Sequence, residues 1–324
     1  MAVRTEPLQA FPAPSGRSGF LWDAYKRMRR NRAAMISMVV IGMLVVTAIF
    51  ADLVAPYSPS EQFLKSSGGV VENPLAPRRT GKFERPTADH VFGTDQLARD
   101  IFSRTVVGLR ISLSAAFFAI VVVTVIGVVV GTFAASGSKS FDDLLMRVTD
   151  ITYAFPDLLF IILLRSVFAD SLFGFKSVLG IEASVLLLFL AISLTAWPTM
   201  ARIIRGQLLT IREMEYTIAA RALGARQSRI AVRHWLPNAV GPAIVEATFL
   251  APRAIFAEAA LSFIGIGVNP PTPSLGVLIS EHFSWLQINW TGVAFPTATL
   301  AVLFLAFQFF GDGLRDAFDP RSRR

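Results

Sequence analysis

The sequence predicts an all-α polytopic membrane protein with six transmembrane helices and both chain ends in the cytoplasm. Hydrophobic residues make up 53% of the 324 and charged residues only 17%, whereas a soluble domain usually carries about a quarter charged residues. The apolar residues also come in blocks of about twenty or more, the length that crosses about 30 Å of hydrocarbon. Basic residues gather beside some of these blocks and are missing beside others. Together these observations place the chain in a bilayer.

The first apolar block covers residues 33–55 and follows a basic stretch that ends at Arg32. A cleaved signal peptide would have an apolar region of only about 7–15 residues after a short basic start. Because about thirty residues precede this longer block, we expect a retained transmembrane helix. Residues 1–32 then form a cytoplasmic N-terminal tail.

Five further blocks complete the predicted set of spans. They lie near 109–135, 145–168, 183–205, 237–264 and 292–312. Between the first two spans we expect a periplasmic loop with an interfacial helix (56–108). The rest divides into a five-helix core (109–312), which includes a cytoplasmic loop (206–236), and a cytoplasmic tail (313–324).

Charge placement sets the orientation of these spans, since cytoplasmic segments carry an excess of Lys and Arg. The tail before Ala33 carries seven such residues, and the segment 265–291 carries none. The loop between spans four and five carries Arg212, Arg221, Arg226, Arg229 and Arg233. The same bias accounts for the net charge of +8, so no nucleic-acid partner is expected.

The cytoplasmic loop reads as two short helices with a bend between them. Residues 213–223 are mostly strong helix formers, and Gly224 suits a left-handed helix cap. A second helical stretch is expected from Gln227 to Trp235, stopping before Pro237. One face of the first helix carries Tyr216, Ala219, Ala220 and Leu223. Small residues on this face would let another protein approach closely, and a helix lying on lipid headgroups is the alternative.

Four charged residues inside the expected spans are candidates for a translocation pathway: Asp157, Glu246, Arg253 and Glu258. A charge at mid-bilayer costs about 2.5–3.5 kcal/mol, so these side chains should face the bundle interior or water. For each of them taken singly, an intramembrane ion pair or another structural role is the simpler explanation. Prolines within the spans, such as Pro156 and Pro198, would kink the helices or free backbone carbonyls.

The sequence lacks the features of an enzyme. No phosphate-binding loop of the form G-x-x-x-x-G-K-[ST] occurs, and the nearest segment, Gly131 to Ser140, has the wrong spacing and is expected to be a turn. There is no cysteine, and His90, His234 and His282 are scattered, so neither a disulfide nor a metal site is expected. Motifs of serine hydrolases and zinc hydrolases are missing as well. We expect no catalytic residue and no cofactor bound by this chain.

Four motifs match one family in combination. The cytoplasmic loop contains Ala219-Ala220-x3-Gly224 and then His234-x-Leu236-Pro237. The segment before the second span reads Gly93-Thr-Asp95-Gln-Leu-Ala-Arg99-Asp100-x2-Ser103-Arg104-x3-Gly108-x-Arg110-x-Ser112-Leu113. The segment after the loop reads Ala257-Glu258-Ala-Ala-Leu-Ser262-Phe-x-Gly265-x-Gly267-Val-x-Pro270-Pro271-Thr-Pro273-Ser274. The last span ends in Gly311-Asp312-Gly313-Leu314-Arg315-Asp316-Ala317-x-Asp319-Pro320-Arg321. In these motifs the chain, from about Leu21 to Arg321, resembles the dipeptide/oligopeptide/nickel group of ABC importer permeases.

This resemblance implies the type I ABC importer permease fold in a bacterial inner membrane, and the basic start with its added first helix is similar to the C-type member of the two-permease pair. It implies as partners a second homologous permease, two ATPase subunits that bind ATP and Mg, and a periplasmic or lipid-anchored solute-binding protein. The loop would be a coupling helix seated on an ATPase through Glu215, Tyr216, Ala219, Ala220, Arg221, Leu223 and Gly224. Glu258 becomes the strongest pathway candidate because it lies in a matching segment.

Two residues depart from the family pattern. Ile218 stands where the family usually has Glu, and Ala98 stands where it usually has Gly. Loss of the charge at 218 implies an ATPase contact that relies more on Arg221 and on apolar packing.

Three functions follow from this sequence, the first being an ATP-driven permease subunit that moves di- or oligopeptides or related solutes by alternating access. The second is a self-sufficient secondary transporter or channel that uses the intramembrane charges, although no internal repeat of the kind common in such transporters is visible. The third is a membrane-anchored scaffold. Dipeptides, longer peptides and nickel chelates are all compatible substrates, because the group shares these motifs.

Overall fold

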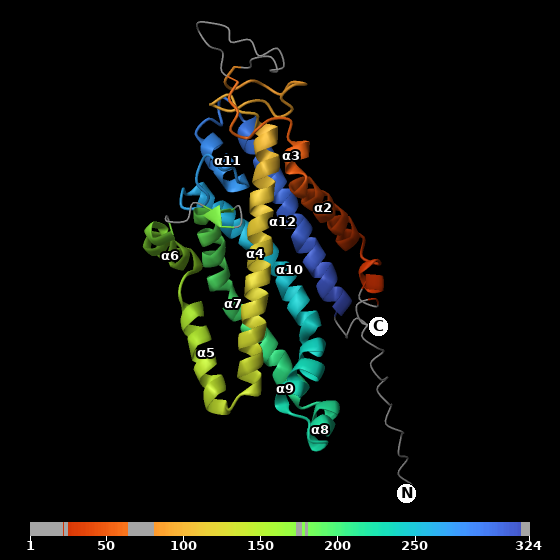
Figure 1. Cartoon of the computed structure of the whole chain (residues 1–324). Helices are drawn as coiled ribbons and strands as arrows, with labels where there is room; N and C mark the ends of the chain where they lie inside the picture. The colour runs from red at the N-terminus through yellow and green to blue at the C-terminus, as the bar shows by residue number, and fades with distance from the viewer. Residues whose placement is uncertain (1–21, 23–24, 64–80, 173–176, 179–180, 319–324) are drawn as a thin grey trace.

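A computed structural model of the chain describes residues 22, 25–63, 81–172, 177–178 and 181–318. The fold is mostly helical (Figure 1). Its elements in chain order are α2 (Arg32–Ile49), α3 (Ala51–Val54), α4 (Ile101–Ser136), α5 (Lys139–Ala154), α6 (Asp157–Leu172), β1 (Ser177–Val178), β2 (Ile181–Glu182), α7 (Ala183–Arg212), α8 (Glu215–Ala222), α9 (Gln227–Ile230), the π-helical turn η1 (Ala231–Trp235), α10 (Leu236–Phe263), α11 (Leu275–Phe283) and α12 (Thr291–Phe318). The two strands pair antiparallel, with Val178 opposite Ile181.

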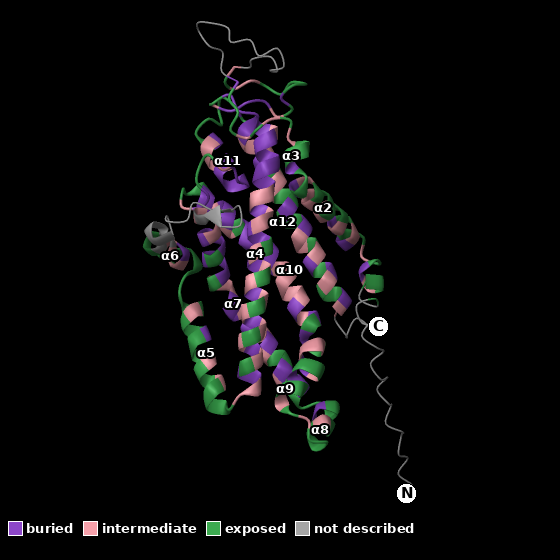
Figure 2. Ribbon diagram, in the orientation of Figure 1, coloured by how far each residue is buried: buried purple, intermediate pink, exposed green. Residues whose placement is uncertain are grey.

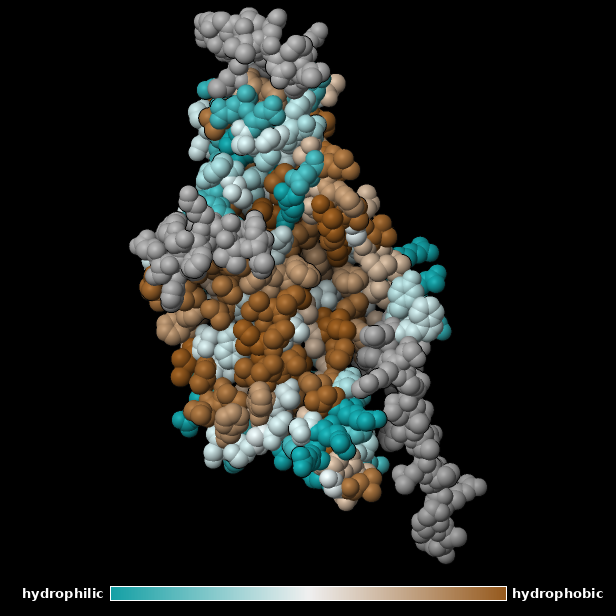
Figure 3. Space-filling model, viewed as in Figure 1, coloured by the Kyte–Doolittle hydropathy of each residue, from teal (hydrophilic) through white to brown (hydrophobic). Residues whose placement is uncertain are grey.

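Five helices in the described part of the chain are long and apolar enough to cross a membrane. They are α2, α4, α7, the continuous stretch from α9 through α10, and α12. Side chains buried in the bundle concentrate along α4, α7 and α10 (Figure 2). On the face shown in Figure 3, hydrophobic surface covers the middle of the bundle and hydrophilic surface gathers toward both ends, as expected for a protein whose mid-section contacts lipid.

The predicted span at 145–168 is not one continuous helix. The chain breaks at Phe155 and Pro156, between α5 and α6, and neither half qualifies as a span by itself. Pro156 has no N–H to donate and holds the preceding Phe155 in an extended conformation, with φ −77° and ψ 133°. The described structure therefore shows five apolar spans plus a broken helical segment.

The second span begins earlier than predicted. Asp100 caps α4 by accepting a hydrogen bond from the Ser103 N–H at 2.7 Å, so the helix starts at Ile101 and runs 36 residues. The first connecting loop therefore ends near residue 100, not 108. Its described residues, 56–63 and 81–100, contain no helix, and any interfacial helix within 64–80 lies outside the described residues.

Close packing of α4 against α7 forms the centre of the bundle. Gly127 and Gly131 face α7, and a Cβ added at Gly131 would lie 2.6 Å from the Ala201 carbonyl oxygen. Small residues spaced four apart let membrane helices approach closely. Gly131 therefore belongs to a helix contact, and the predicted turn is confined to Gly137 and Ser138, which caps α5.

Candidate coupling loop and membrane-embedded charges

α8 projects from the end of the bundle opposite α11 (Figure 1). Its side chains are mostly exposed, including the predicted interface residues Glu215, Ala219 and Arg221. Large apolar side chains are exposed with them: Met214 (44%), Tyr216 (43%), Ile218 (53%) and Leu223 (88%). Four large apolar side chains exposed on one short polar loop are typical of interaction surfaces.

Gly224 ends α8 in the way that the sequence predicts. Its φ is +79°, a left-handed conformation that glycine adopts without steric cost. The Gly224 N–H donates to the Arg221 carbonyl at 3.0 Å, and the Ala225 N–H donates to the Ala220 carbonyl at 3.1 Å. This pair of bonds is the Schellman motif, which turns the chain sharply after α8.

The inner side of the loop is anchored to the bundle. The buried hydroxyl of Thr217 donates to the Ile211 carbonyl at the end of α7, at 2.9 Å. Ile230 and Trp235 are fully buried in the core formed with α7, and Ala220 packs against the same core. Partial burial raises the pKa of the Tyr216 phenol, which stays protonated at neutral pH. α8 is therefore held against the end of α7 and against the stretch that leads into α10.

The helix after α8 does not stop before Pro237, so that prediction was wrong. The turn Ala231–Trp235 is π-helical, with the Leu236 N–H donating to the Ala231 carbonyl. This widened turn carries the helix past a proline, which has no N–H to donate. The loop thus continues directly into α10.

Three of the four predicted pathway residues meet at one cavity. Asp157 of α6 and Glu246 and Arg253 of α10 line a cavity of about 120 Å³. Glu246 Oε1 lies 3.2 Å from Arg253 Nη1, while 63% of the Arg253 side chain is exposed. The structure therefore brings together charges that are 96 residues apart in sequence, counting from residue 157 to residue 253.

Glu246 and Arg253 also line a larger, open groove of about 780 Å³ between α7, α10 and α12. Gln308, Asp312 and Arg315 of α12 line the same groove. Charged and amide side chains on a membrane helix avoid lipid and face water or another protein. The polar part of the groove lining is therefore better suited to water or protein than to lipid.

Glu258, the strongest candidate from the sequence, lies elsewhere. It is fully buried and lines neither of these two cavities. Its carboxylate accepts hydrogen bonds from Ser112 at 2.7 Å and from Ser262 at 2.8 Å. Ser262 in turn accepts from the Val268 N–H at 3.0 Å. This network joins α4 to α10 and the following loop, so the geometry favours a structural role for Glu258.

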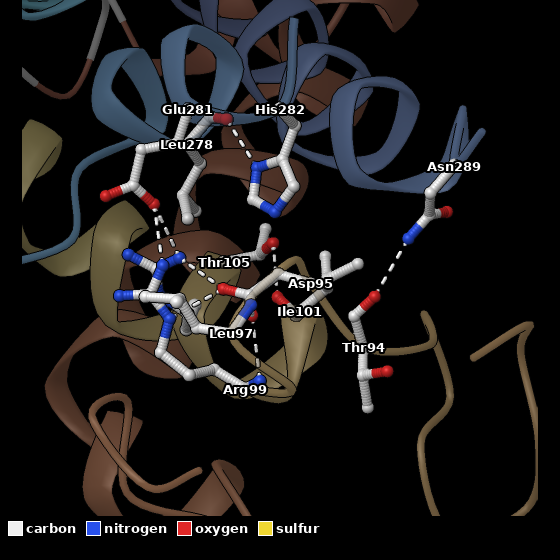
Figure 4. Close-up of polar contacts among 11 residues, drawn as sticks. Thr94, Asp95, Leu97, Arg99, Ile101, Thr105, Leu278, Glu281, His282 and Asn289 are labelled. Atoms are coloured by element: carbon white, nitrogen blue, oxygen red, sulfur yellow. Dashed lines mark hydrogen bonds and ion pairs between the residues drawn. The ribbon is translucent and has the colours of Figure 1, made fainter. Parts of the chain in front are cut away.

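A buried ionic cluster at the α11 end had no assigned role in the sequence analysis (Figure 4). Asp95 accepts from Arg99 at 2.6 Å and from Arg104 at 2.8 Å. Both arginines also donate to Glu281 of α11, at 3.0 and 2.7 Å. Nearby, Asn289 donates to the Thr94 carbonyl at 2.8 Å. The cluster fastens the first connecting loop and the start of α4 to α11. The motif Asp95-x3-Arg99-x4-Arg104 was the sequence signal for this cluster. Glu281 could not be recognised as its partner, because it lies far from the motif in sequence.

His282 lies beside this cluster and is fully buried. Its Nδ1 lies 2.6 Å from the Leu278 carbonyl oxygen, which can only accept, so Nδ1 carries the proton. Burial, and to a smaller extent the positive charge of Arg104, lowers the pKa of the imidazole below its ordinary value. The ring is therefore neutral at neutral pH.

Comparison with known proteins agrees with this arrangement. The family described as "Binding-protein-dependent transport system inner membrane component" matches residues 124–324, and the "N-terminal TM domain of oligopeptide transport permease C" matches residues 19–76. The oligopeptide transport system permease protein OppC of Bacillus subtilis (strain 168) is 37% identical over 311 residues, which cover 96% of this chain and 93% of that protein. The dipeptide transport system permease protein DppC of the same organism is 35% identical, covering 93% of this chain and 86% of that protein.

A solved structure shares the fold. The permease-like chain comes from an inward-facing conformation of the MetNI methionine ABC transporter, with a TM-score of 0.53 and 21% sequence identity. The match covers 66% of this chain and 96% of that chain. At this identity the likeness concerns architecture alone. From the family match and the relatives, the chain belongs to the binding-protein-dependent transport system inner membrane components, and it is a multi-pass protein of the inner membrane.

Proposed function

We propose that this chain is one of two homologous permease subunits of an ATP-driven ABC importer of di- or oligopeptides. The names of its relatives support a peptide substrate, and the exposed apolar surface of α8 supports a partner at that end. Substrate would arrive on a solute-binding protein at the α11 end. It would then pass between the two permeases by alternating access.

The path of the chain supports six spans with both ends in the cytoplasm. α4 ends at the α8 end of the bundle, and α7 begins nearer the opposite end (Figure 1). The broken segment α5–α6 would then carry the chain back across the membrane. Counting this segment with the five apolar helices gives six crossings, so the two chain ends lie on one side. The basic N-terminal residues indicate that this side is cytoplasmic.

In this orientation α8 is a coupling helix seated on an ATPase subunit. ATP and Mg would be bound by the two ATPases, since the sequence has no phosphate-binding loop. Leu223, Ile218 and Tyr216 would contact the ATPase through apolar side chains, with Arg221 as the charged neighbour. Thr217 and Ala220, held against the bundle, would transmit the movement of the ATPases to α7 and α10.

The groove between α7, α10 and α12 would face the second permease and the translocation pathway. Arg253 at its wall is 63% exposed, and lipid contact there would cost about 2.5–3.5 kcal/mol on insertion scales. A water-filled pathway or a polar protein surface removes this cost. The charges of the groove thus select the face on which the partner permease sits.

Leu223→Asp tests the coupling role with little risk to the fold, because the side chain is 88% exposed. We expect the assembled complex to lose ATPase binding, binding-protein-stimulated ATP hydrolysis and peptide uptake in proteoliposomes. Leu223→Met, which keeps an apolar side chain, should retain all three. If Leu223→Asp still co-purifies with the ATPases and supports normal uptake, α8 lies on lipid headgroups and the coupling role is wrong.

A further inference from the structure

The cavity of about 120 Å³ lies where α5 ends and α6 begins, against α7 and α10. Its polar lining consists of Tyr153, Asp157, Thr195, Thr199, Glu246 and Arg253. These side chains come from four helices, and Asp157 stands in the first turn of α6. Helices broken within the membrane commonly form substrate sites in transporters, because the break brings polar groups to mid-bilayer.

Charge in this cavity is unbalanced. Two carboxylates, Asp157 and Glu246, oppose one guanidinium, that of Arg253. Arg253 is paired with Glu246, and Asp157 has no hydrogen bond or ion pair among the described residues. An unopposed carboxylate within a membrane protein is costly unless a cation or water reaches it. The Asp157 carboxylate is thus available to bind a positively charged group.

The size of the cavity limits what can enter it. The volume of about 120 Å³ is a little below the roughly 150 Å³ of an engineered protein cavity that admits benzene. This space holds one small amino-acid residue and not a whole peptide. Glu246 and Arg253 line the open groove as well as this cavity, so a peptide lying in the groove can place one end in the cavity.

We propose that this cavity binds the N-terminal residue of a passing peptide. The peptide's ammonium group donates to the Asp157 carboxylate, and the exposed Arg253 guanidinium donates to the first peptide carbonyl oxygen. The C-terminal carboxylate is disfavoured here, because the cavity carries one excess negative charge. This inference rests on the proposed function, and it adds that the permease itself distinguishes the amino end of its substrate.

The cysteine-free sequence provides a direct test, since a single introduced thiol is the only one in the chain. Thr199→Cys places a thiol in the cavity lining, and Ile203→Cys, one turn along α7, places a control thiol in the groove. Each variant is assembled with cysteine-free partner subunits, with and without ATP turnover. Its modification rate is then measured with a trimethylammonium methanethiosulfonate and with a sulfonate methanethiosulfonate.

We expect the Thr199→Cys thiol to react faster with the cationic reagent. Adding Asp157→Asn should lower the ratio of cationic to anionic rates by about tenfold, as removal of one nearby charge predicts. The ratio at Ile203→Cys should change by less than about threefold, because the groove is lined by other charges. A tripeptide with a free amino group should protect the Thr199→Cys thiol, while its N-acetylated form should not.

Three results would overturn the inference. The Thr199→Cys thiol is not modified in any state, Asp157→Asn leaves the ratio of cationic to anionic rates unchanged, or the acetylated peptide protects the thiol as well as the free one does. Peptide uptake is followed in the same proteoliposomes. If ATP-driven uptake continues while one of these three results is found, the amino-end site is wrong and the proposed function stands. If the wild-type complex shows no ATP-dependent uptake, the proposed function itself fails.

Discussion

At the scale of single residues, the α11 end contains buried charges that neutralise one another. Arg104 is fully buried, and its guanidinium is neutralised by Asp95 and Glu281. Removing Glu281 would leave two arginines facing one carboxylate in a site where Glu281 itself is only 17% exposed. The contribution of a charged group to the free energy of unfolding depends on how deeply it is buried. Burial differs sharply among the ion pairs of this protein.

Glu281→Ala should therefore lower the free energy of unfolding by about 3 kcal/mol, the lower end of the range for breaking a buried pair. Asp52→Ala is the matched control. Asp52 pairs with Arg110 at 2.8 Å but is 81% exposed, so its loss should cost less than about 1 kcal/mol. Denaturant titration in detergent micelles measures both. Equal losses for the two variants would show that the cluster does not hold α11.

His282 should make the stability of the α11 end depend on pH. Its pKa in the folded protein lies below the ordinary value of 6.5, so the unfolded chain binds the proton more readily. Stability is then full above the unfolded pKa and falls as the pH drops from 6.5 toward the folded pKa. Burial and the charge of Arg104 oppose protonation of the ring more strongly than the bond to Leu278, Asp95 and Glu281 favour it.

The measurement for His282 is thermal unfolding of the complex at pH 7.5 and 5.5. His282→Asn retains a donor for the Leu278 carbonyl without a group that titrates in this range. We expect the wild-type melting temperature to fall more on acidification than that of the variant. An identical fall in both would remove His282 as a cause of acid sensitivity.

At the scale of elements, the α4–α7 contact depends on glycines, not on large apolar residues. A Cβ on Gly131 would lie 2.6 Å from the Ala201 carbonyl oxygen and 2.9 Å from Ile204 Cβ. Neither atom can move without shifting the backbone or repacking the core. Gly42 of α2 provides the comparison, because nothing lies within 4 Å of a Cβ placed there.

Gly131→Ala should destabilise the protein by about 1–3 kcal/mol through overpacking. Gly42→Ala should instead stabilise it by up to about 1 kcal/mol, because alanine is the better helix former. The same denaturant titration separates the two by the sign of the change. If Gly131→Ala is also neutral or stabilising, α4 and α7 do not pack at the distance described.

Elements that depend on local chemistry were predictable from the sequence, and those that depend on distant contacts were not. Gly224 ends α8 as predicted, since the Schellman cap is set by neighbouring residues. The passage of a helix through Pro237 was missed, because the π-helical turn that permits it has no local signature. The sequence showed a proline at position 156. That the helix is interrupted there became clear only from the extended backbone of Phe155 in the structure. Gly127-x3-Gly131 is a readable signal of helix contact, whereas the turn predicted from the sequence began at Gly131.

In the candidate site, too, features set by local sequence were predictable and features set by distant contacts were not. The exposed face of α8 was predictable, because helical spacing alone places Tyr216, Ala219 and Leu223 together. The placement of Asp157 and Arg253 at one cavity was not predictable, because it depends on how α6 and α10 each pack against α7. Of the two roles that the sequence left open for Glu258, pathway or structure, the hydrogen bonds from Ser112 and Ser262 favour the structural one.

At the scale of the whole molecule, the two ends of the bundle have different properties. The α11 end is fastened by buried ion pairs, and the α8 end presents exposed apolar residues above a packed core. A bundle that is rigid at one end and open to a partner at the other suits a subunit moved by external ATPases. A self-sufficient transporter would need no partner surface on α8.

Uptake by the purified subunits in proteoliposomes distinguishes an ATP-driven permease subunit from a self-sufficient transporter. We predict that peptide accumulates only when the chain is combined with a second permease, two ATPases, ATP and the binding protein. The chain alone, under an imposed pH gradient, should accumulate none. Uptake by the chain alone that is driven by the pH gradient would contradict the account and identify a secondary transporter.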